Sequence, residues 1–235
     1  MVMLEKLRRS IVVLFLALLT ALLLYVDGPK STTVPSLPTQ TQNTNSQLAN
    51  DVLDSIAVKG RAPKTDYKRS NFGDGWEQLP GCDTRNYILK RDMIDVKTRS
   101  LTDCTVASGK LNDLYTSKTI TFVRGAGTSD KVQIDHVVAL SDAWQKGAQG
   151  LSFNERVMFA NDGLNLLAVD GKTNQDKSDS DAASWLPPNK AYRCLYVARQ
   201  LAVKQKYRLW ITSGEKDAMK RVLNDCPDQK LPVVN

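Results

Sequence analysis

The chain contains a single histidine, His136, which directly follows a carboxylate, Asp135, inside the apolar run VQIDHVVAL (132–140). An imidazole has an unperturbed pKa of about 6.5, so it can take up or release a proton near neutral pH. A lone histidine in such a run is commonly a structural residue, hydrogen-bonded at a strand edge. The alternative is a general base, and because no second histidine exists, no other imidazole can take that role.

Further polar residues follow His136 at positions that fit a small structural unit. The runs VQIDHVVAL and LNLLAVD (164–170) have the apolar composition of buried strands, and GKTNQDKSD (171–179) is typical of a turn that opens a helix. Two antiparallel strands followed by a helix would bring five polar side chains close together: Asp135, His136, Asn165, Asn174 and Lys177. This arrangement is the pattern of a ββα-metal nuclease finger.

The ordered set D-H, N-L-L and N-x-x-K over residues 135–177 resembles the HNH endonucleases, in the variant whose last motif position is asparagine. The sequence looks closest to the exported bacterial HNH family that shares the GmrSD-type C-terminal nuclease domain. The similarity covers roughly residues 55–226 and includes the segments TFVRG and AASWLPPNKAYRCLYVARQ. It implies an α+β fold in which a ββα-metal (His-Me) finger is embedded in a mostly helical single domain.

The resemblance also implies a role for each residue of the motif. Asp135 and Asn174 would hold a metal ion, and His136 would activate water as the general base. Asn165 would fix the loop and the orientation of the histidine, although a turn asparagine is the structural alternative. Lys177 would contact phosphate, with a solvated helix residue as the equally frequent alternative.

The oxygen ligands favour a hard cation, Mg²⁺ or Mn²⁺. Such an ion polarises the phosphate and stabilises the departing 3′-oxygen, and water and phosphate would fill its remaining octahedral positions. The family's commoner third histidine is replaced by Asn174, which argues against zinc.

Two arginines outside the motif are candidate substrate contacts. Arg85 follows Cys82 in GCDTRN, and Arg124 ends the alternating run KTITFVRG (118–125). A guanidinium pairs well with phosphate oxygens. Each arginine is equally suited to a structural ion pair.

Residues 1–27 have the composition of an export signal, since basic residues precede a charge-free apolar run from Ile11 to Val26. The run is long for a signal-peptide core and short for a bilayer span of about 20 residues. A cleaved signal peptide and an uncleaved membrane anchor are therefore both open, and the lack of a small-x-small cleavage pattern favours the anchor. Either one places the remainder outside the cytoplasm, as a secreted protein or on the outer face of the cell membrane.

The polar segment 28–50 is rich in Thr, Ser, Pro, Gln and Asn and is expected to be a disordered linker. Residues 51–235 suit one domain with its own core. Its even number of cysteines beyond an export signal favours two disulfides. Three connectivities are possible, and the short-loop choice is favoured: Cys82–Cys104 with Cys194–Cys226.

The formal net charge of +7 is compatible with a polyanionic partner. Together these features predict an exported, metal-dependent endonuclease that hydrolyses DNA with little sequence preference, with RNA as a further candidate substrate. The rival hypothesis is a non-catalytic surface protein that binds extracellular DNA or acidic polymers. No protein partner is inferred.

Overall fold

The computed structural model describes residues 47–233. The expected signal or anchor, residues 1–27, and most of the expected linker lie outside the described residues. The first described helix begins at Ala49, two residues before the predicted domain start, because Ala49 is buried and Leu48 forms a bridge with Lys230. Within residues 47–233, none of the helices has the length and apolar character needed to cross a membrane.

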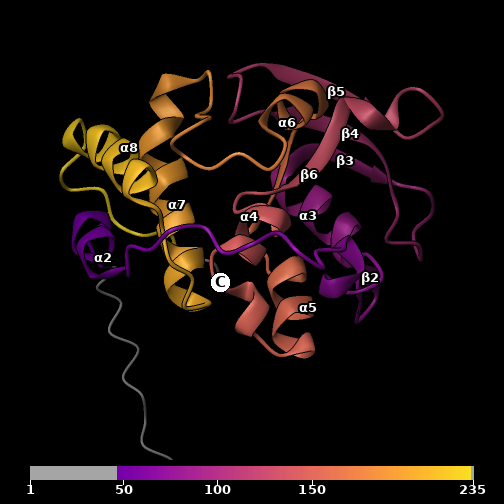
Figure 1. Ribbon diagram of the computed structural model, residues 1–235. Coiled ribbons are helices and arrows are strands. Elements are labelled where there is room, and N and C mark those ends of the chain that lie inside the picture. The colour runs from indigo at the N-terminus through magenta and orange to yellow at the C-terminus, as the bar shows by residue number, and fades with distance from the viewer. Residues whose placement is uncertain (1–46, 234–235) are drawn as a thin grey trace, which may run out of the picture. The chain divides into compact units, whose positions relative to one another are not determined.

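The architecture is α+β, as predicted (Figure 1). The α-helices are α2 (Ala49–Ser55), α3 (Thr84–Asp92), α4 (Leu140–Gln145), α5 (Phe153–Asn161), α6 (Gly171–Lys177), α7 (Arg193–Lys206) and α8 (Ser213–Asn224). The strands are β1 (Gln78–Leu79), β2 (Cys82–Asp83), β3 (Met93–Thr98), β4 (Val106–Asn112), β5 (Thr119–Val123), β6 (Val132–His136) and β7 (Leu166–Asp170). Short 3₁₀ turns are η1 (Arg69–Phe72), η2 (Ser129–Lys131), η3 (Ala148–Gly150) and η4 (Lys190–Tyr192).

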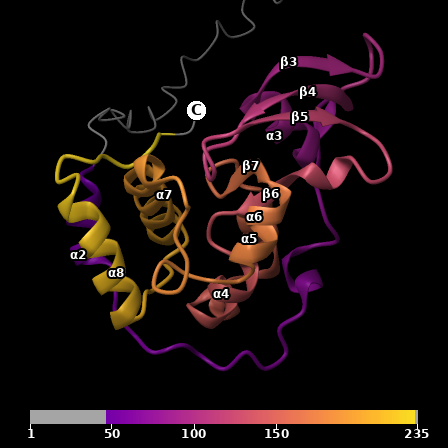
Figure 2. The same ribbon diagram turned by 90° about the horizontal axis from the view of Figure 1, so that it is seen from above.

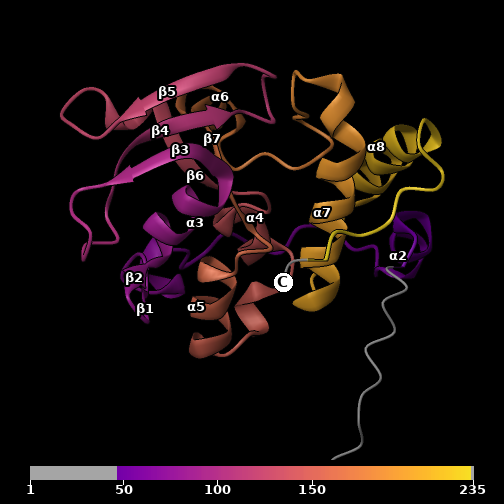
Figure 3. The same cartoon turned by 180° about the vertical axis from the view of Figure 1, so that it is seen from behind.

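The strands form small antiparallel sheets. Strands β3, β4 and β5 make one sheet in that order, and β6 pairs with β7 in register from Val132↔Asp170 to His136↔Leu166. Helices α2, α7 and α8 pack against one another on one side of the β6–β7 pair, and the three-stranded sheet with α3 lies on the other (Figures 2 and 3).

Strand β7 is buried on both faces, because successive side chains of a strand point to opposite sides. Leu166 and Ala168 belong to the core shared with α3 and β5, whereas Leu167 and Val169 belong to the core shared with α7 and α8. A slip of one residue would exchange the two faces, so this packing fixes the register of the strands that carry the motif.

Helix α6 follows β7 immediately, which gives the predicted order of strand, strand and helix. Asp170 caps the helix, since its carboxylate accepts hydrogen bonds from the Thr173 backbone N–H and hydroxyl at 2.8 and 2.7 Å. Gly171 is required at the turn, because a Cβ there would lie 1.8 Å from the Asp130 carbonyl oxygen. The capped turn sets the direction in which α6 crosses the strand pair.

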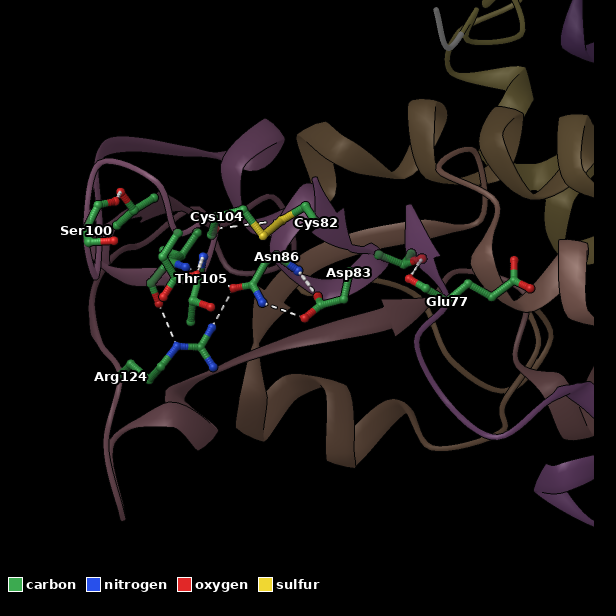
Figure 4. Close-up of a disulfide and its surroundings, with 12 residues drawn as sticks. Glu77, Cys82, Asp83, Asn86, Ser100, Cys104, Thr105 and Arg124 are labelled. Atoms are coloured by element: carbon green, nitrogen blue, oxygen red, sulfur yellow. Dashed lines mark hydrogen bonds between the residues drawn. A yellow bond between two sulfur atoms is a disulfide. The ribbon is translucent and has the colours of Figure 1, made fainter. Parts of the chain in front are cut away.

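Both predicted disulfides are confirmed. Cys82–Cys104 joins the start of α3 to the β3–β4 loop (Figure 4), and Cys194–Cys226 joins the start of α7 to the end of α8. Their Cα–Cα distances are 5.5 and 6.4 Å. Each bridge closes a short segment and secures a helix end.

A network of buried charges links α4, α7, α8 and the segment after α6. Lys146 donates to carboxylates at 2.6–2.7 Å from three places in the chain: Asp142, Asp181 and Glu215. Lys204 and Arg61 complete the network. Burial raises the pKa of Asp181, but the hydrogen bond and charge of Lys146 and the charge of Arg61 outweigh it and bring this pKa to about 2.

Candidate functional site

A groove of about 820 Å³ runs along β6, the start of α4, α6 and the segment before η1. Four residues of the predicted site line it together: Arg85, Asp135, His136 and Asn174. Asn165, Lys177 and Arg124 do not line it. The strand pair and α6 therefore bring three of the five motif residues, Asp135, His136 and Asn174, to one open hollow.

His136 is held in one tautomer by the backbone. Its Nε2 atom lies 2.9 Å from the Ala160 carbonyl oxygen at the end of α5. Because a carbonyl only accepts, Nε2 must carry the hydrogen, and in the neutral ring Nδ1 is then the proton acceptor. Trp76 stacks against the imidazole, with ring centroids 5.8 Å apart and planes 9° from parallel. The ring is thereby fixed in orientation on two sides.

Burial lowers the pKa of His136 to about 3. The hydrogen bond to Ala160 acts in the opposite direction, and the positive charges of Arg69 and Lys177 lower the pKa further. At neutral pH the imidazole is therefore uncharged, which is the form that can accept a proton.

Asp135 points to the opposite face of β6 from His136, since neighbouring strand residues alternate. Its Oδ1 accepts a hydrogen bond from Lys177 Nζ at 2.9 Å, and its Oδ2 accepts one from the Tyr115 hydroxyl at 2.5 Å. Burial raises the pKa of Asp135, while the charge of Lys177 and the two hydrogen bonds act in the opposite direction. The carboxylate is held rigidly between these two fully buried partners.

The position of Lys177 differs from the one expected for a residue that contacts phosphate. Its side chain is fully buried, and its ammonium donates to Asp135 and, at 2.9 Å, to the His136 backbone carbonyl. It neither reaches the groove nor faces solvent. Its position makes it the counter-ion of Asp135 and a clamp on the end of β6.

Asn165 is completely buried and binds the loop that follows His136. Its Oδ1 accepts from the Val138 N–H at 2.8 Å, and its Nδ2 donates to the Val138 carbonyl at 3.2 Å. The backbone N–H of Val137 donates to the Asn165 carbonyl at 2.8 Å. Asn165 is thus placed to hold the backbone beside His136 and not to contact a substrate.

The two predicted metal ligands, Asp135 and Asn174, differ in how many of their oxygen atoms already accept hydrogen bonds. Asn174 donates through Nδ2 to Gln133 Oε1 at 2.9 Å, and its Oδ1 accepts no hydrogen bond from residues 47–233. Each oxygen of Asp135 accepts one hydrogen bond and retains a second lone-pair site. One carboxylate and one amide oxygen suit a hard, largely hydrated cation. In the described part of the chain, no cluster of three or more His, Cys, Asp or Glu could hold a more fully liganded ion.

The two predicted arginine contacts are placed differently. Arg85 lines the groove, and its guanidinium donates to the Val132 carbonyl at 3.3 Å. Burial and the charge of Arg124 lower the pKa of Arg85. Arg124 donates to the Val106 carbonyl at 2.6 Å and to Asn86 Oδ1 at 2.7 Å (Figure 4), which ties β4 and β5 to α3. Arg85 remains a candidate substrate contact, whereas the geometry of Arg124 is that of a structural tie.

A basic residue that the sequence did not single out lines the same groove as the histidine. Arg69 lines both the groove and a smaller hollow of about 160 Å³ beside His136. Its side chain is exposed and forms no ion pair with the described residues. Lys64 also lines the groove, although it pairs with Asp179 at 2.9 Å. Both precede the motif by about 70 residues, so no spacing rule connects them to it.

The sequence matches the family described as GmrSD restriction endonucleases, C-terminal domain, over residues 83–222. This span is more than half of the chain and contains the whole strand–strand–helix unit with its polar side chains. The chain belongs to this family. The predicted resemblance to the GmrSD-type domain is thereby confirmed.

A curated relative shares almost the full length. An uncharacterized secreted protein of Arthroderma benhamiae is 34% identical over 215 residues, which are 90% of this chain and 98% of that protein. No solved structure matches the chain significantly. Lys64 and Arg69 lie before the family span, so this family member completes its groove with residues from outside the matched domain. Trp76, which lines the smaller hollow beside His136, also precedes that span.

Proposed function

We propose that this protein is an exported endonuclease that hydrolyses DNA phosphodiester bonds with a divalent cation and with little sequence preference. The observation that carries the proposal is the placement of His136, a neutral imidazole with Nδ1 as its acceptor, on a groove that also contains Asn174 and Arg69. Among residues 47–233, Arg69 forms no ion pair. Membership of a restriction endonuclease family and the secreted relative support it.

In this proposal His136 accepts the proton of the attacking water. The hydrogen bond from Nε2–H to Ala160 keeps Nδ1 free for that proton and stabilises the imidazolium that forms. Asn165 keeps the adjacent loop in place, and Trp76 limits rotation of the ring. These contacts pre-organise the base before the substrate arrives.

Asp135 and Asn174 would hold the cation, as a ββα-metal finger requires. The bound ion, Mg²⁺ or Mn²⁺, would neutralise charge on the scissile phosphate and on the leaving oxygen. Lys177 and Tyr115 keep the Asp135 carboxylate in place. Arg69 and Arg85 would pair with phosphate oxygens at the two sides of the groove.

DNA is the proposed substrate because three cations, Lys64, Arg69 and Arg85, are among the residues that line the groove and the chain carries a net charge of +7. The proposed lack of sequence preference rests on the absence of a recognisable base-reading motif in the sequence. The proposed location is extracellular, supported by the two disulfides and the secreted relative. Attachment through residues 1–27 stays a prediction.

The proposal is tested by incubating the purified protein with supercoiled plasmid, linear duplex, single-stranded DNA and RNA. Cleavage should be abolished by EDTA and restored by excess Mg²⁺ or Mn²⁺. Asn174→Ala should lose activity that extra Mn²⁺ partly restores, whereas Gln175→Ala, which alters the next groove residue on α6, should behave like the wild type. Cleavage that persists in EDTA would contradict the metal dependence, and binding without cleavage would favour a non-catalytic DNA-binding protein.

A further inference from the structure

A separate hollow, of about 480 Å³, lies between the 182–190 segment, the start of α7 and α8. We refer to it as the α7–α8 pocket. Its walls include Ala182, Trp185, Lys190, Arg193, Arg221 and Asp225. None of these residues lines the groove that contains His136.

The cations of the α7–α8 pocket lack carboxylate partners. Within residues 47–233, neither Lys190, Arg193 nor Arg221 lies within ion-pair distance of an acidic side chain, although Asp225 lines the same pocket. Elsewhere the chain pairs its enclosed lysines tightly, as with Lys146 at 2.6–2.7 Å. Three unpaired cations from separate elements around one hollow are the charge arrangement of an anion-binding site.

The pocket holds the Arg193 guanidinium in a fixed position, and a disulfide ties together the two helices that carry Arg193 and Arg221. The Arg193 Nε–H donates to the Pro187 carbonyl at 2.8 Å, so its terminal nitrogens remain for another acceptor. The adjacent Cys194 is bonded to Cys226, which joins the start of α7 to the end of α8, the helix that carries Arg221. A guanidinium held in this way can bind phosphate oxygens with little loss of side-chain entropy.

The pocket adjoins the groove along the chain. Ser178 and Asp179 line the groove, and Ala182 lines the pocket. Three peptide units separate Asp179 from Ala182, which limits the distance between their Cα atoms to about 11 Å. The linings of the two hollows therefore approach each other within a distance that a few nucleotides can span.

We propose that the α7–α8 pocket binds a backbone phosphate of the nucleic-acid substrate, away from the scissile bond. This inference rests on the proposed function, since it names a second contact for the same substrate. Trp185 supplies an apolar wall beside the cations, which suits the sugar or base attached to that phosphate. The pocket increases affinity for long strands and places no residue on the reacting atoms.

The first test measures binding of a fluorescent 20-nucleotide single strand against salt, in a His136→Ala background that prevents cleavage. Lys190→Gln combined with Arg221→Gln should weaken binding about tenfold at low salt. It should reduce the slope of log Kd against log salt by about 0.7, the contribution of one phosphate on a single strand. Lys220→Gln combined with Lys230→Gln removes the same charge from exposed positions outside both hollows and should leave the slope unchanged.

The second test does not require nuclease activity. The oligonucleotide should shift the NMR signals of the Trp185 indole and backbone N–H in the wild type and not in the Lys190/Arg221 variant. Inorganic phosphate and a mononucleotide serve as comparison ligands. Equal salt slopes for the two double variants, or Trp185 signals that respond only to free phosphate, would overturn the inference. If the wild type binds no nucleic acid at all, the proposed function fails, and a Trp185 shift with phosphate alone would then identify a site for a small free anion.

Discussion

The burial of Lys177 gives a prediction with a defined magnitude. Its ammonium lies 2.9 Å from Asp135 Oδ1, and the lysine side chain is completely buried. With an effective dielectric constant of about 20, two unit charges at that distance attract each other by about 6 kcal/mol. Most of this attraction offsets desolvation, and removal of one partner from a buried pair typically costs about 3–5 kcal/mol. Lys177→Met should therefore destabilise the fold by that amount.

The assay is urea unfolding at pH 7.5 in EDTA, so that cation binding does not contribute, with fluorescence and circular dichroism compared to test two-state behaviour. Lys172→Met is the matched control, because Lys172 is on the same helix, is 79% exposed and pairs with Asp176 at 3.0 Å. An exposed pair four residues apart contributes about 0.3–0.5 kcal/mol. Asp135→Asn combined with Lys177→Met removes both charges and should recover about 1–3 kcal/mol relative to the sum of the single variants.

Two results would refute this reasoning. A Lys177→Met variant that loses less than about 1 kcal/mol would mean that the ammonium is solvated. A double variant whose loss equals the sum of the two single losses would mean that Lys177 and Asp135 do not interact. Either result would also remove the argument that Lys177 positions Asp135 for the metal.

Three further predictions address separate features. The folded-state pKa of Asp181, about 2, lies below the ordinary value of an aspartate. The ionised carboxylate therefore stabilises the fold fully above about pH 4, and this contribution is lost as the pH falls toward 2. Asp181→Asn should flatten the dependence of unfolding free energy on pH in this range. Replacement of Cys194 and Cys226 by serine should lower stability by about 3 kcal/mol in chemical unfolding, and an unchanged midpoint would contradict a structural bridge. Arg69→Ala should raise KM for DNA about tenfold, because Arg69 lines the groove. Lys68→Ala, which alters the preceding exposed residue, should leave KM unchanged. Equal KM values for the two variants would exclude Arg69 as a phosphate contact.

Helices and strands could be predicted from the sequence where helix-capping residues or apolar strand patterns were clear. The capping box of Ser152 and Glu155 begins α5, and Thr212 caps α8 by accepting from the Glu215 N–H at 3.2 Å. The apolar runs around His136 and after Asn165 form the expected antiparallel pair. Strands β3 and β4 were not predicted, because MIDVKT and VASGKLN lack a clear apolar alternation and their pairing contains register irregularities.

The candidate site was predictable as a set of residue types but not as a set of contacts. Sequence order placed Asp135 and Lys177 near each other, yet only the packing of α6 on β6 decides that Lys177 points inward to the carboxylate. Glu215 illustrates the same limit, since its position suggests a simple helix cap while its side chain binds Lys146 at 2.6 Å. Arg69 could not be found, because it reaches the groove through tertiary folding of a segment outside the motif.

The central claim is that His136 is the general base of a phosphodiesterase. The most direct measurement is the single-turnover rate of plasmid cleavage by His136→Ala at saturating protein and Mg²⁺, with DNA affinity and thermal unfolding measured on the same preparation. Loss of a positioned base should lower the rate by about 10²–10⁴-fold while DNA affinity stays within a few-fold of the wild type. A folded His136→Ala protein that cleaves DNA at the wild-type rate would contradict the account.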